Sequence, residues 1–151
     1  MSDIVSPDKR SKLMSGIRGK NTKPEMIIRQ ALHKKGLRYR LHAKNIAGKP
    51  DLVFPKYNAV ILVHGCFWHG HNCHLFKWPK SRSEFWHDKI TGNQVRDKTI
   101  TKKLTKLGWR ICTIWECSLK GKEKLPLEET IDKIDLWLKS ATLTLEIRGK
   151  I

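Results

Sequence analysis

The chain has 151 residues, with 31 Lys and Arg against 14 Asp and Glu, which gives a formal net charge of +17 and a pI of about 10.0. That length suits one domain with its own core, and the charge favours a polyanionic partner, because each phosphate neutralised by Lys or Arg releases condensed counterion. The sequence has no run of about 18 apolar residues and no apolar segment typical of a signal peptide near its start, which excludes a membrane span and predicts a cytoplasmic protein whose cysteines are thiols or metal ligands.

The first predicted helix covers about residues 23–35. Thr22 and Glu25 have the spacing of a capping box, and Pro24 lies in the first turn, where a backbone N–H has no helical partner to lose. Apolar residues then recur on one helical face as far as Gly36, namely Met26, Ile27, Ala31 and Leu32.

Three strands are predicted next. Residues 37–42 alternate apolar with basic side chains, as an edge strand does, whereas residues 51–54 and 59–63 are short runs rich in β-branched residues. Pro55 and Asn58 give residues 55–58 the composition of a turn. The second and third strands are therefore expected to form a hairpin.

The second half of the chain alternates helix and strand. Residues 83–90 predict a short helix, and residues 94–107 a longer basic helix that ends at Gly108. Residues 109–115 predict a buried strand and residues 126–140 a helix, whereas residues 142–151 carry no clear pattern. Trp109, Trp115 and Trp137 fit core positions.

Residues 64–73 concentrate metal-binding side chains, and Cys117 lies just past the strand at 109–115. A closed tetrahedral Cys₃His set is typical of structural zinc, because it leaves no position for a reacting water. The four candidate ligands are Cys66, His71, Cys73 and Cys117. His74 is an alternative to His71, and small buried thiols beside surface histidines are the alternative to zinc. Cys112 lies among apolar residues and is predicted to be core.

A second group of residues suggests hydrolytic chemistry. Asp51 opens a predicted strand, where a carboxylate is well placed to hold a hard cation such as Mg²⁺ together with phosphate oxygens. The run 59–63 leads to His64 and then to His69, which can take a proton from an attacking water. The alternatives are a turn-forming Asp and packed histidines. Within so basic a chain, the combination favours metal-assisted phosphodiester cleavage.

Aromatic side chains form a third group beside the second. Phe67 and Trp68 lie in a polar segment, and Trp86 follows Lys77, Lys80 and Arg82. Rings flanked by cations suit stacking on bases or wedging between them. The alternative is that these rings pack on the candidate zinc loop as a small satellite core.

The order of these motifs is similar to that of the very short patch repair endonucleases, from the N-terminal arm to about residue 125. The motifs are Gly48-Lys49-Pro50-Asp51-Leu52-Val53-Phe54, Val63-His64-Gly65-Cys66-Phe67-Trp68-His69 with His71 and Cys73, Ser83-Glu84-Phe85-Trp86, Gly108-Trp109-Arg110 and Trp115-Glu116-Cys117. The resemblance implies an α/β, restriction-endonuclease-like fold, with a mixed central sheet flanked by helices and a structural zinc site. It also implies an enzyme that nicks double-stranded DNA on the 5' side of the mismatched T in a T:G mismatch.

The resemblance also implies roles for individual residues. It makes Asp51 and the backbone carbonyl of Val63 ligands of Mg²⁺, and His69 the group that activates water. The other implied catalytic residues are Asp97, which orients the water-activating group, His64, a second active-site histidine, and Glu25, an acidic residue near the metals. The implied zinc ligands are Cys66, His71, Cys73 and Cys117. The implied DNA contacts are Phe67, Trp68 and Trp86 from the major groove and Met14 from the minor groove.

Three departures from the expected patterns stand out. Val63 replaces a Thr of the family pattern, which is compatible with metal binding through the backbone. Gly70 interrupts a histidine run and has no assigned role. The wider nuclease fold often carries Glu-x-Lys on the second hairpin strand. Val63 and His64, at that place in this chain, supply neither the carboxylate nor the lysine.

We expect three segments: a DNA-contacting arm (1–22), a single endonuclease domain (23–141) and a C-terminal tail (142–151). A monomer is expected, with mismatch-repair proteins as candidate partners and no membrane association. Two other classes stay open: a zinc-stabilised DNA-binding module without catalysis, and a basic RNA-binding protein.

Overall fold

The computed structural model describes residues 21–150, so Met14 and the arm as far as residue 20 lie outside the described residues. A five-stranded sheet in the order β1-β2-β3-β4-β5 forms the centre. β1, β2 and β3 are antiparallel neighbours, whereas β3, β4 and β5 are parallel. The strands are β1 (Arg40–Leu41), β2 (Leu52–Phe54), β3 (Ala59–His64), β4 (Arg110–Trp115) and β5 (Thr144–Ile147).

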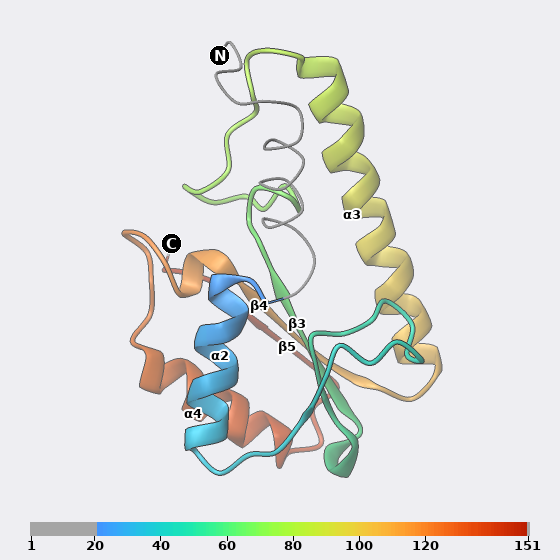
Figure 1. The fold of residues 1–151 in the computed structure, drawn as a ribbon, viewed down its shortest axis with the longest axis vertical. Helices are drawn as coiled ribbons and strands as arrows, with labels where there is room; N and C mark the ends of the chain where they lie inside the picture. The colour runs from blue at the N-terminus through green and yellow to red at the C-terminus, as the bar shows by residue number, and fades with distance from the viewer. Residues whose placement is uncertain (1–20, 151) are drawn as a thin grey trace.

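Helices cover both faces of this sheet (Figure 1). The helices are α2 (Lys23–Lys34), α3 (Ser83–Lys106) and α4 (Leu127–Leu138). Strand residues alternate between two apolar clusters, because successive side chains of a strand point to opposite faces. One cluster packs the strands against α2 and α4, with Leu52 and Ile61 at its centre. The other packs Val60 and Leu62 against Leu104 of α3. The sheet is thus the middle layer between α3 on one face and α2 and α4 on the other.

The first helix and the hairpin confirm the expectations from the sequence. Thr22 caps α2 by accepting a hydrogen bond from the Glu25 N–H at 3.4 Å. A short 3-10 turn, η1 (Pro55–Tyr57), joins β2 to β3, and Asn58 adopts a left-handed conformation after it. The edge strand predicted for residues 37–42 is present but contains only the two residues of β1.

One prediction about elements is wrong, and one segment without a predicted element contains a strand. The separate helices at 83–90 and 94–107 are one continuous helix, α3, because a single Gly92 costs only about 1 kcal/mol and flanking packing outweighs it. The tail predicted for residues 142–151 contains β5, which pairs with β4. Its partner lies far away in the sequence, so local patterning alone gave no signal. In residues 21–150, no helix is both long and apolar enough to cross a membrane.

Of the three tryptophans predicted to be core, only Trp137 is fully so, at 4% exposed. Trp109 packs at the margin of the α3 cluster and is partly buried. Trp115 is also partly buried, and its indole stacks on the ring of His71 and meets that of His64 edge to face. Its position therefore belongs to the candidate site rather than to the core.

Candidate active site and metal centre

The site is built where the parallel strands β3 and β4 end. Their carboxyl ends meet at one edge of the sheet, with His64 opposite Trp115 in the pairing register. Loop 65–82 leaves β3 at this edge, and the 3-10 turn η2 (Glu116–Ser118) leaves β4 there. Side chains from both sequence halves are thereby brought together, as expected for the carboxyl edge of an α/β sheet.

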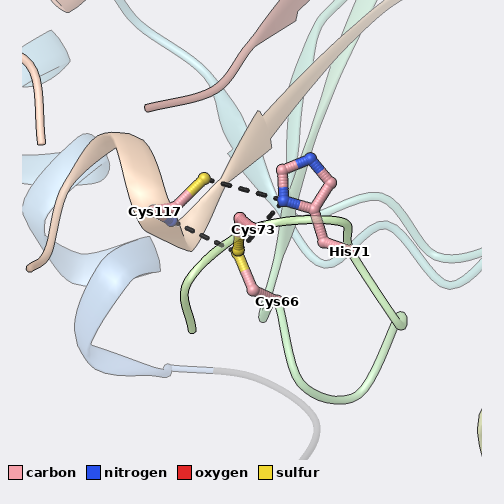
Figure 2. Close-up of side chains that lie close together, drawn as sticks. All are labelled: Cys66, His71, Cys73 and Cys117. Carbon is pink, nitrogen blue, oxygen red and sulfur yellow. Dashed lines mark hydrogen bonds between the residues drawn. The ribbon is translucent and has the colours of Figure 1, made fainter. Parts of the chain in front are cut away.

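Three thiols and one imidazole converge at this edge (Figure 2). The Nδ1 atom of His71 lies 3.5 Å from Cys66 Sγ and 3.6 Å from Cys117 Sγ. All four ligand atoms, those of Cys66, His71, Cys73 and Cys117, lie within 4.8 Å of one another. A tetrahedral metal ion requires ligand atoms at about this mutual separation.

Backbone contacts prepare this cluster, here called the thiol cluster. The N–H of Cys117 donates to Cys66 Sγ at 3.3 Å, and the N–H of Gly149 donates to Cys117 Sγ at 3.3 Å. A Cβ on Gly149 would lie 2.6 Å from the carbonyl oxygen of Cys117, so only glycine allows this approach. The segment after β5 is thus part of the site.

The electrostatics of the thiol cluster suit a cation. Burial raises the pKa of the Cys66 and Cys117 thiols, so without a positive charge they stay protonated. A divalent cation stabilises thiolates directly, and the donor set fits such an ion. His74 is outside the cluster, because its Nδ1 lies 2.8 Å from a Glu123 carboxylate oxygen. Cys112 is fully buried in the core, as predicted.

A second group joins the end of β3 to α3. The rings of His64 and His69 are stacked, with centroids 3.9 Å apart and planes 7° from parallel. His69 Nδ1 lies 2.5 Å from an Asp97 carboxylate oxygen on α3. Donation by this Nδ1–H leaves the Nε2 lone pair of His69 free to accept a proton. The arrangement can therefore act as a general base held by a carboxylate.

His64 has a different environment from its stacked neighbour. Burial, with the positive charge of a protonated His69 as the next cause, lowers the pKa of His64 to about 4. Its ring is thus neutral at neutral pH. Its Nδ1 is buried without a hydrogen-bond partner among the described residues.

A third group, here called the carboxylate cluster, lies between α2 and the start of β2. It contains Glu25, His42 and Asp51, whose ligand atoms lie within 4.8 Å of one another. The N–H of Val63 donates to Asp51 Oδ2 at 2.7 Å, which ties this carboxylate to β3. Burial, with the nearby Glu25 carboxylate also contributing, raises the pKa of Asp51 to about 7. Two carboxylates this close compete for a proton or share a cation.

Glu25 is 1% exposed, and one of its carboxylate oxygens has two side-chain partners. Arg29 Nη1 lies 3.3 Å from Glu25 Oε2, and His42 Nε2 lies 2.7 Å from the same oxygen. His42 carried no functional signal in the sequence, where it was only the last residue of the alternating segment 37–42. Its involvement follows from the pairing of β1 with β2, which brings residue 42 beside residue 51.

The aromatic side chains form a connected surface cluster beside these groups. The ring of Phe67 lies 5.4 Å from that of Trp68 and 5.4 Å from that of Trp86, both edge to face. Phe76 and Trp78, which sequence reasoning missed, extend the cluster, and Trp78 is 49% exposed. The rings pack on one another and still reach the surface, so packing and DNA contact are compatible here.

Helix α3 fixes the loop that carries these rings. Asn93 Nδ2 donates to the carbonyl oxygen of Trp68 at 2.9 Å, and Gln94 Nε2 donates to that of Gly70 at 3.2 Å. Gly70 has φ +59°, and a Cβ there would lie 2.4 Å from Gln94 Nε2. The glycine that interrupts the histidine run thus has a packing role that the sequence did not reveal.

The structure brings together most of the catalytic and metal-binding residues predicted from sequence, in three groups: the thiol cluster, the carboxylate cluster and a histidine group. Predicted residues of the carboxylate cluster are Glu25 and Asp51, beside Val63, and those of the histidine group are His64, His69 and Asp97. Val63 and His64 are consecutive at the end of β3, so the two groups share one strand end. Of the predicted DNA contacts, only Met14 falls outside the described residues.

Comparison with known proteins identifies relatives along the whole chain. The family model for DNA mismatch endonuclease Vsr matches residues 2–75. DNA mismatch endonuclease Vsr of Escherichia coli K12 is 38% identical over 151 residues, covering 99% of this chain and 97% of its own length. The type II nicking enzyme V.XorIIP of Xanthomonas oryzae pv. oryzae is 47% identical over 119 residues, covering 79% of this chain and 88% of its own length. V.NmeAIP of Neisseria meningitidis, another type II nicking enzyme, is 46% identical over 122 residues, covering 81% of this chain and 87% of its own length.

Proposed function

Because the chain belongs to the DNA mismatch endonuclease Vsr family, we propose that the three groups at the end of β3 form one nicking site for mismatched DNA. The chain is a DNA mismatch endonuclease of very short patch repair, a hydrolase. Its substrate is DNA with a T:G mismatch, and the strand is nicked on the 5' side of the mismatched T. The observation that carries the proposal is the meeting of a carboxylate pair that could hold a cation and an Asp-held histidine at one strand end.

The carboxylate cluster fits a divalent cation. Asp51 would hold it, with the backbone carbonyl of Val63 beside it, and Glu25 adds a second carboxylate. Mg²⁺ prefers oxygen ligands of this kind and usually completes its shell with water and phosphate oxygens. When bound, such an ion stabilises the charge that develops on the phosphoryl group during hydrolysis.

His69 is the proposed general base. Asp97 holds its Nδ1–H, which fixes the ring orientation and directs Nε2 away from the carboxylate. The neutral His64 ring supports His69 by stacking and keeps a second imidazole nitrogen at the strand end. In this proposal His69 accepts the proton of the attacking water, while the carboxylate cluster would hold the cation.

Zinc is the proposed occupant of the thiol cluster. Three sulfur donors and one imidazole nitrogen match the ligands that zinc selects, and a closed four-ligand set gives a structural role. The bound ion would hold loop 66–73 to η2, and with it the residues that carry His69 and the aromatic rings.

The aromatic cluster is the proposed wedge at the mismatch. Phe67, Trp68 and Trp86 are half-buried, so they can enter a duplex from the major groove without a large rearrangement of the core. Met14 remains a proposed minor-groove contact on the arm 1–22. A restriction-endonuclease-like fold, a monomeric endonuclease domain from residue 23 to 141 and mismatch-repair partners belong to the same proposal.

The experiment compares Asp51→Asn with the wild type on a T:G duplex labelled on each strand. We expect the wild type to nick only the T strand with Mg²⁺ and to stop with EDTA. Asp51→Asn should lose nicking yet keep nearly full mismatch binding, because the basic surface and the rings supply most of the affinity. Appreciable nicking by Asp51→Asn would exclude the metal-holding role.

The same assay separates the two other classes. A DNA-binding module without catalysis would bind the duplex with the wild-type chain but leave both strands intact under all metal conditions. A basic RNA-binding protein would prefer an RNA duplex and would not distinguish T:G from T:A.

A further inference from the structure

The carboxylate cluster contains a nitrogen donor that the proposed function does not use. His42 Nε2 lies 2.7 Å from Glu25 Oε2 and within 4.8 Å of the Asp51 ligand atom. Two carboxylates and one imidazole at this separation form a three-ligand set, and histidine is the commonest metal-binding side chain in proteins. A site for Mg²⁺ alone would have no need of the nitrogen.

A backbone hydrogen bond holds His42 beside Asp51. β1 ends at Leu41, and the N–H of His42 donates to the carbonyl oxygen of Asp51 at 3.2 Å, so residues 42 and 51 stay side by side. His42 has φ +46°, a left-handed conformation that non-glycine residues adopt rarely. Its imidazole is 19% exposed, so the ring faces the cluster rather than solvent.

A need to pair the Glu25 carboxylate does not by itself explain why His42 lies in the cluster. Arg29 already contacts the same oxygen of Glu25 at 3.3 Å, and the N–H of Asn21 donates to the other oxygen at 3.1 Å. Without His42, the Glu25 carboxylate would therefore still have the Arg29 guanidinium and the Asn21 N–H as partners. Asp51, by contrast, has its Oδ2 engaged by the N–H of Val63 at 2.7 Å.

From this geometry we infer that His42 is a third side-chain ligand of the catalytic cation, beside Glu25 and Asp51, and that it makes the site select Mn²⁺ over Mg²⁺. This inference rests on the proposed function of the carboxylate cluster. Carboxylate oxygens serve both ions, but an imidazole nitrogen adds affinity for the transition-metal ion Mn²⁺ and little for the harder Mg²⁺.

The test measures the bound ion directly, in addition to nicking. Zinc-loaded protein is mixed with the nicked T:G duplex, which supplies phosphate oxygens without turnover, and Mn²⁺ is titrated by electron paramagnetic resonance. Electron spin echo modulation then detects nitrogen bound to Mn²⁺, and labelling histidine with ¹⁵N identifies the nitrogen as imidazole. Calorimetry gives the Kd for Mg²⁺ under the same conditions.

His42→Gln is the informative variant, because its amide N–H can still donate to Glu25 while its oxygen replaces the nitrogen ligand. We expect it to lose the histidine modulation and to weaken Mn²⁺ binding by about tenfold or more, with little change for Mg²⁺. His33→Gln is the matched control, since His33 is an exposed histidine near the end of α2. This control should behave as the wild type.

Bound Mn²⁺ without histidine modulation in the wild type would overturn the inference, and this result does not depend on whether the variant folds. Equal Mn²⁺ affinity in wild type and a folded His42→Gln would also overturn it. Nicking with Mg²⁺ by the wild type, measured in parallel, would show in either case that the proposed function stands. Absence of both nicking and cation binding would instead remove the proposed function and the inference with it.

Discussion

His69 and His64 lie parallel in one stack, but their surroundings give them different capacities. Asp97 holds His69 Nδ1, whereas the Nδ1 of His64 is buried without a partner among the described residues, and its pKa is lowered to about 4. A group that stays neutral and enclosed is a poor proton acceptor at neutral pH. The proton of the attacking water is therefore expected to reach His69.

Replacing His69 with Ala should slow the chemical step by about a hundredfold to ten-thousandfold, with mismatch binding close to wild type. Asp97→Asn should lower the same rate without changing DNA affinity, because an amide can stabilise the wrong tautomer of His69. Single-turnover nicking on a T:G duplex measures both. A larger loss in His64→Ala than in His69→Ala would transfer the base role to His64.

Single residues were predictable where the type of side chain determines its use. Cys66, Cys73 and Cys117 stood out because thiols beside a histidine have few other uses, and Cys112 was separated from them by its apolar neighbours. His42 was not predictable, because its role depends on the pairing of β1 with β2 and on a left-handed backbone conformation. His71 and His74 were distinguished only in the structure, where His71 Nδ1 lies 3.5 Å from Cys66 Sγ and His74 is hydrogen-bonded to Glu123.

Among the elements, α3 holds loop 65–73 in position. It carries Asp97, and its Asn93 and Gln94 bind the backbone of the loop. The loop can lie this close because Gly70 has no side chain. The rate of nicking is therefore expected to depend on Gly70, a residue for which no substrate contact is proposed.

Gly70→Ala should lower the free energy of unfolding by at least about 1–2 kcal/mol, since a non-glycine residue at a left-handed φ is strained. The added methyl should also displace His69 and reduce nicking. Gly92→Ala is the matched control within α3, because a Cβ there meets no atom within 4 Å. It should stabilise the helix by about 0.5–1 kcal/mol. Urea unfolding compares the two, and equal effects would contradict the packing role of Gly70.

The aromatic cluster gives a prediction about discrimination. Phe67→Ala should reduce the preference for a T:G over a T:A duplex, because a mismatch lowers the unstacking cost by about a few kcal/mol and only an inserted ring uses that difference. Phe67→Leu keeps apolar packing without the ring and separates wedge from core. Competition binding measures the preference. Equal losses on both duplexes would indicate that Phe67 serves only packing.

Elements were predicted best where the signal is local. The capping box and the hairpin turn depend on neighbouring residues, and α2, β2 and β3 were found within a residue or two. The expected break near Gly92 did not occur, because the helix receives support from the loop it binds. β5 was missed, because a four-residue strand is defined by its parallel partner β4 rather than by its own pattern.

At the scale of the whole molecule, the thiol cluster connects the two halves of the chain. Cys117→Ala should lower zinc content and melting temperature together, because the metal contributes part of the folding free energy. Cys112→Ala is the matched control: it also removes a buried thiol, but it should leave zinc content at one ion per chain. Metal analysis and thermal unfolding test the pair. Unchanged zinc and melting in Cys117→Ala would refute this ligand set.

Metal removal should distinguish the same thiols chemically. After chelation, a thiol reagent should modify Cys73 first in the folded protein, because it is the partly exposed thiol of the cluster. Cys66 and Cys117 are buried and should follow more slowly, because loss of the ion loosens the contact between the loop and η2. Cys112 should react only in denaturant, since it is completely buried and burial raises its pKa. Mass spectrometry of the labelled peptides identifies each site. Early labelling of Cys112 would contradict its core position.

The backbone donation from Gly149 to Cys117 also bears on the order in which the molecule assembles. The thiol ligands come from both sides of the crossover between β3 and β4, and the last donor comes after β5. Such contacts form late, because the entropy of closing long loops must be overcome first. Refolding chains should thus acquire helix well before they capture zinc, and the appearance of nicking activity should follow the kinetics of metal uptake.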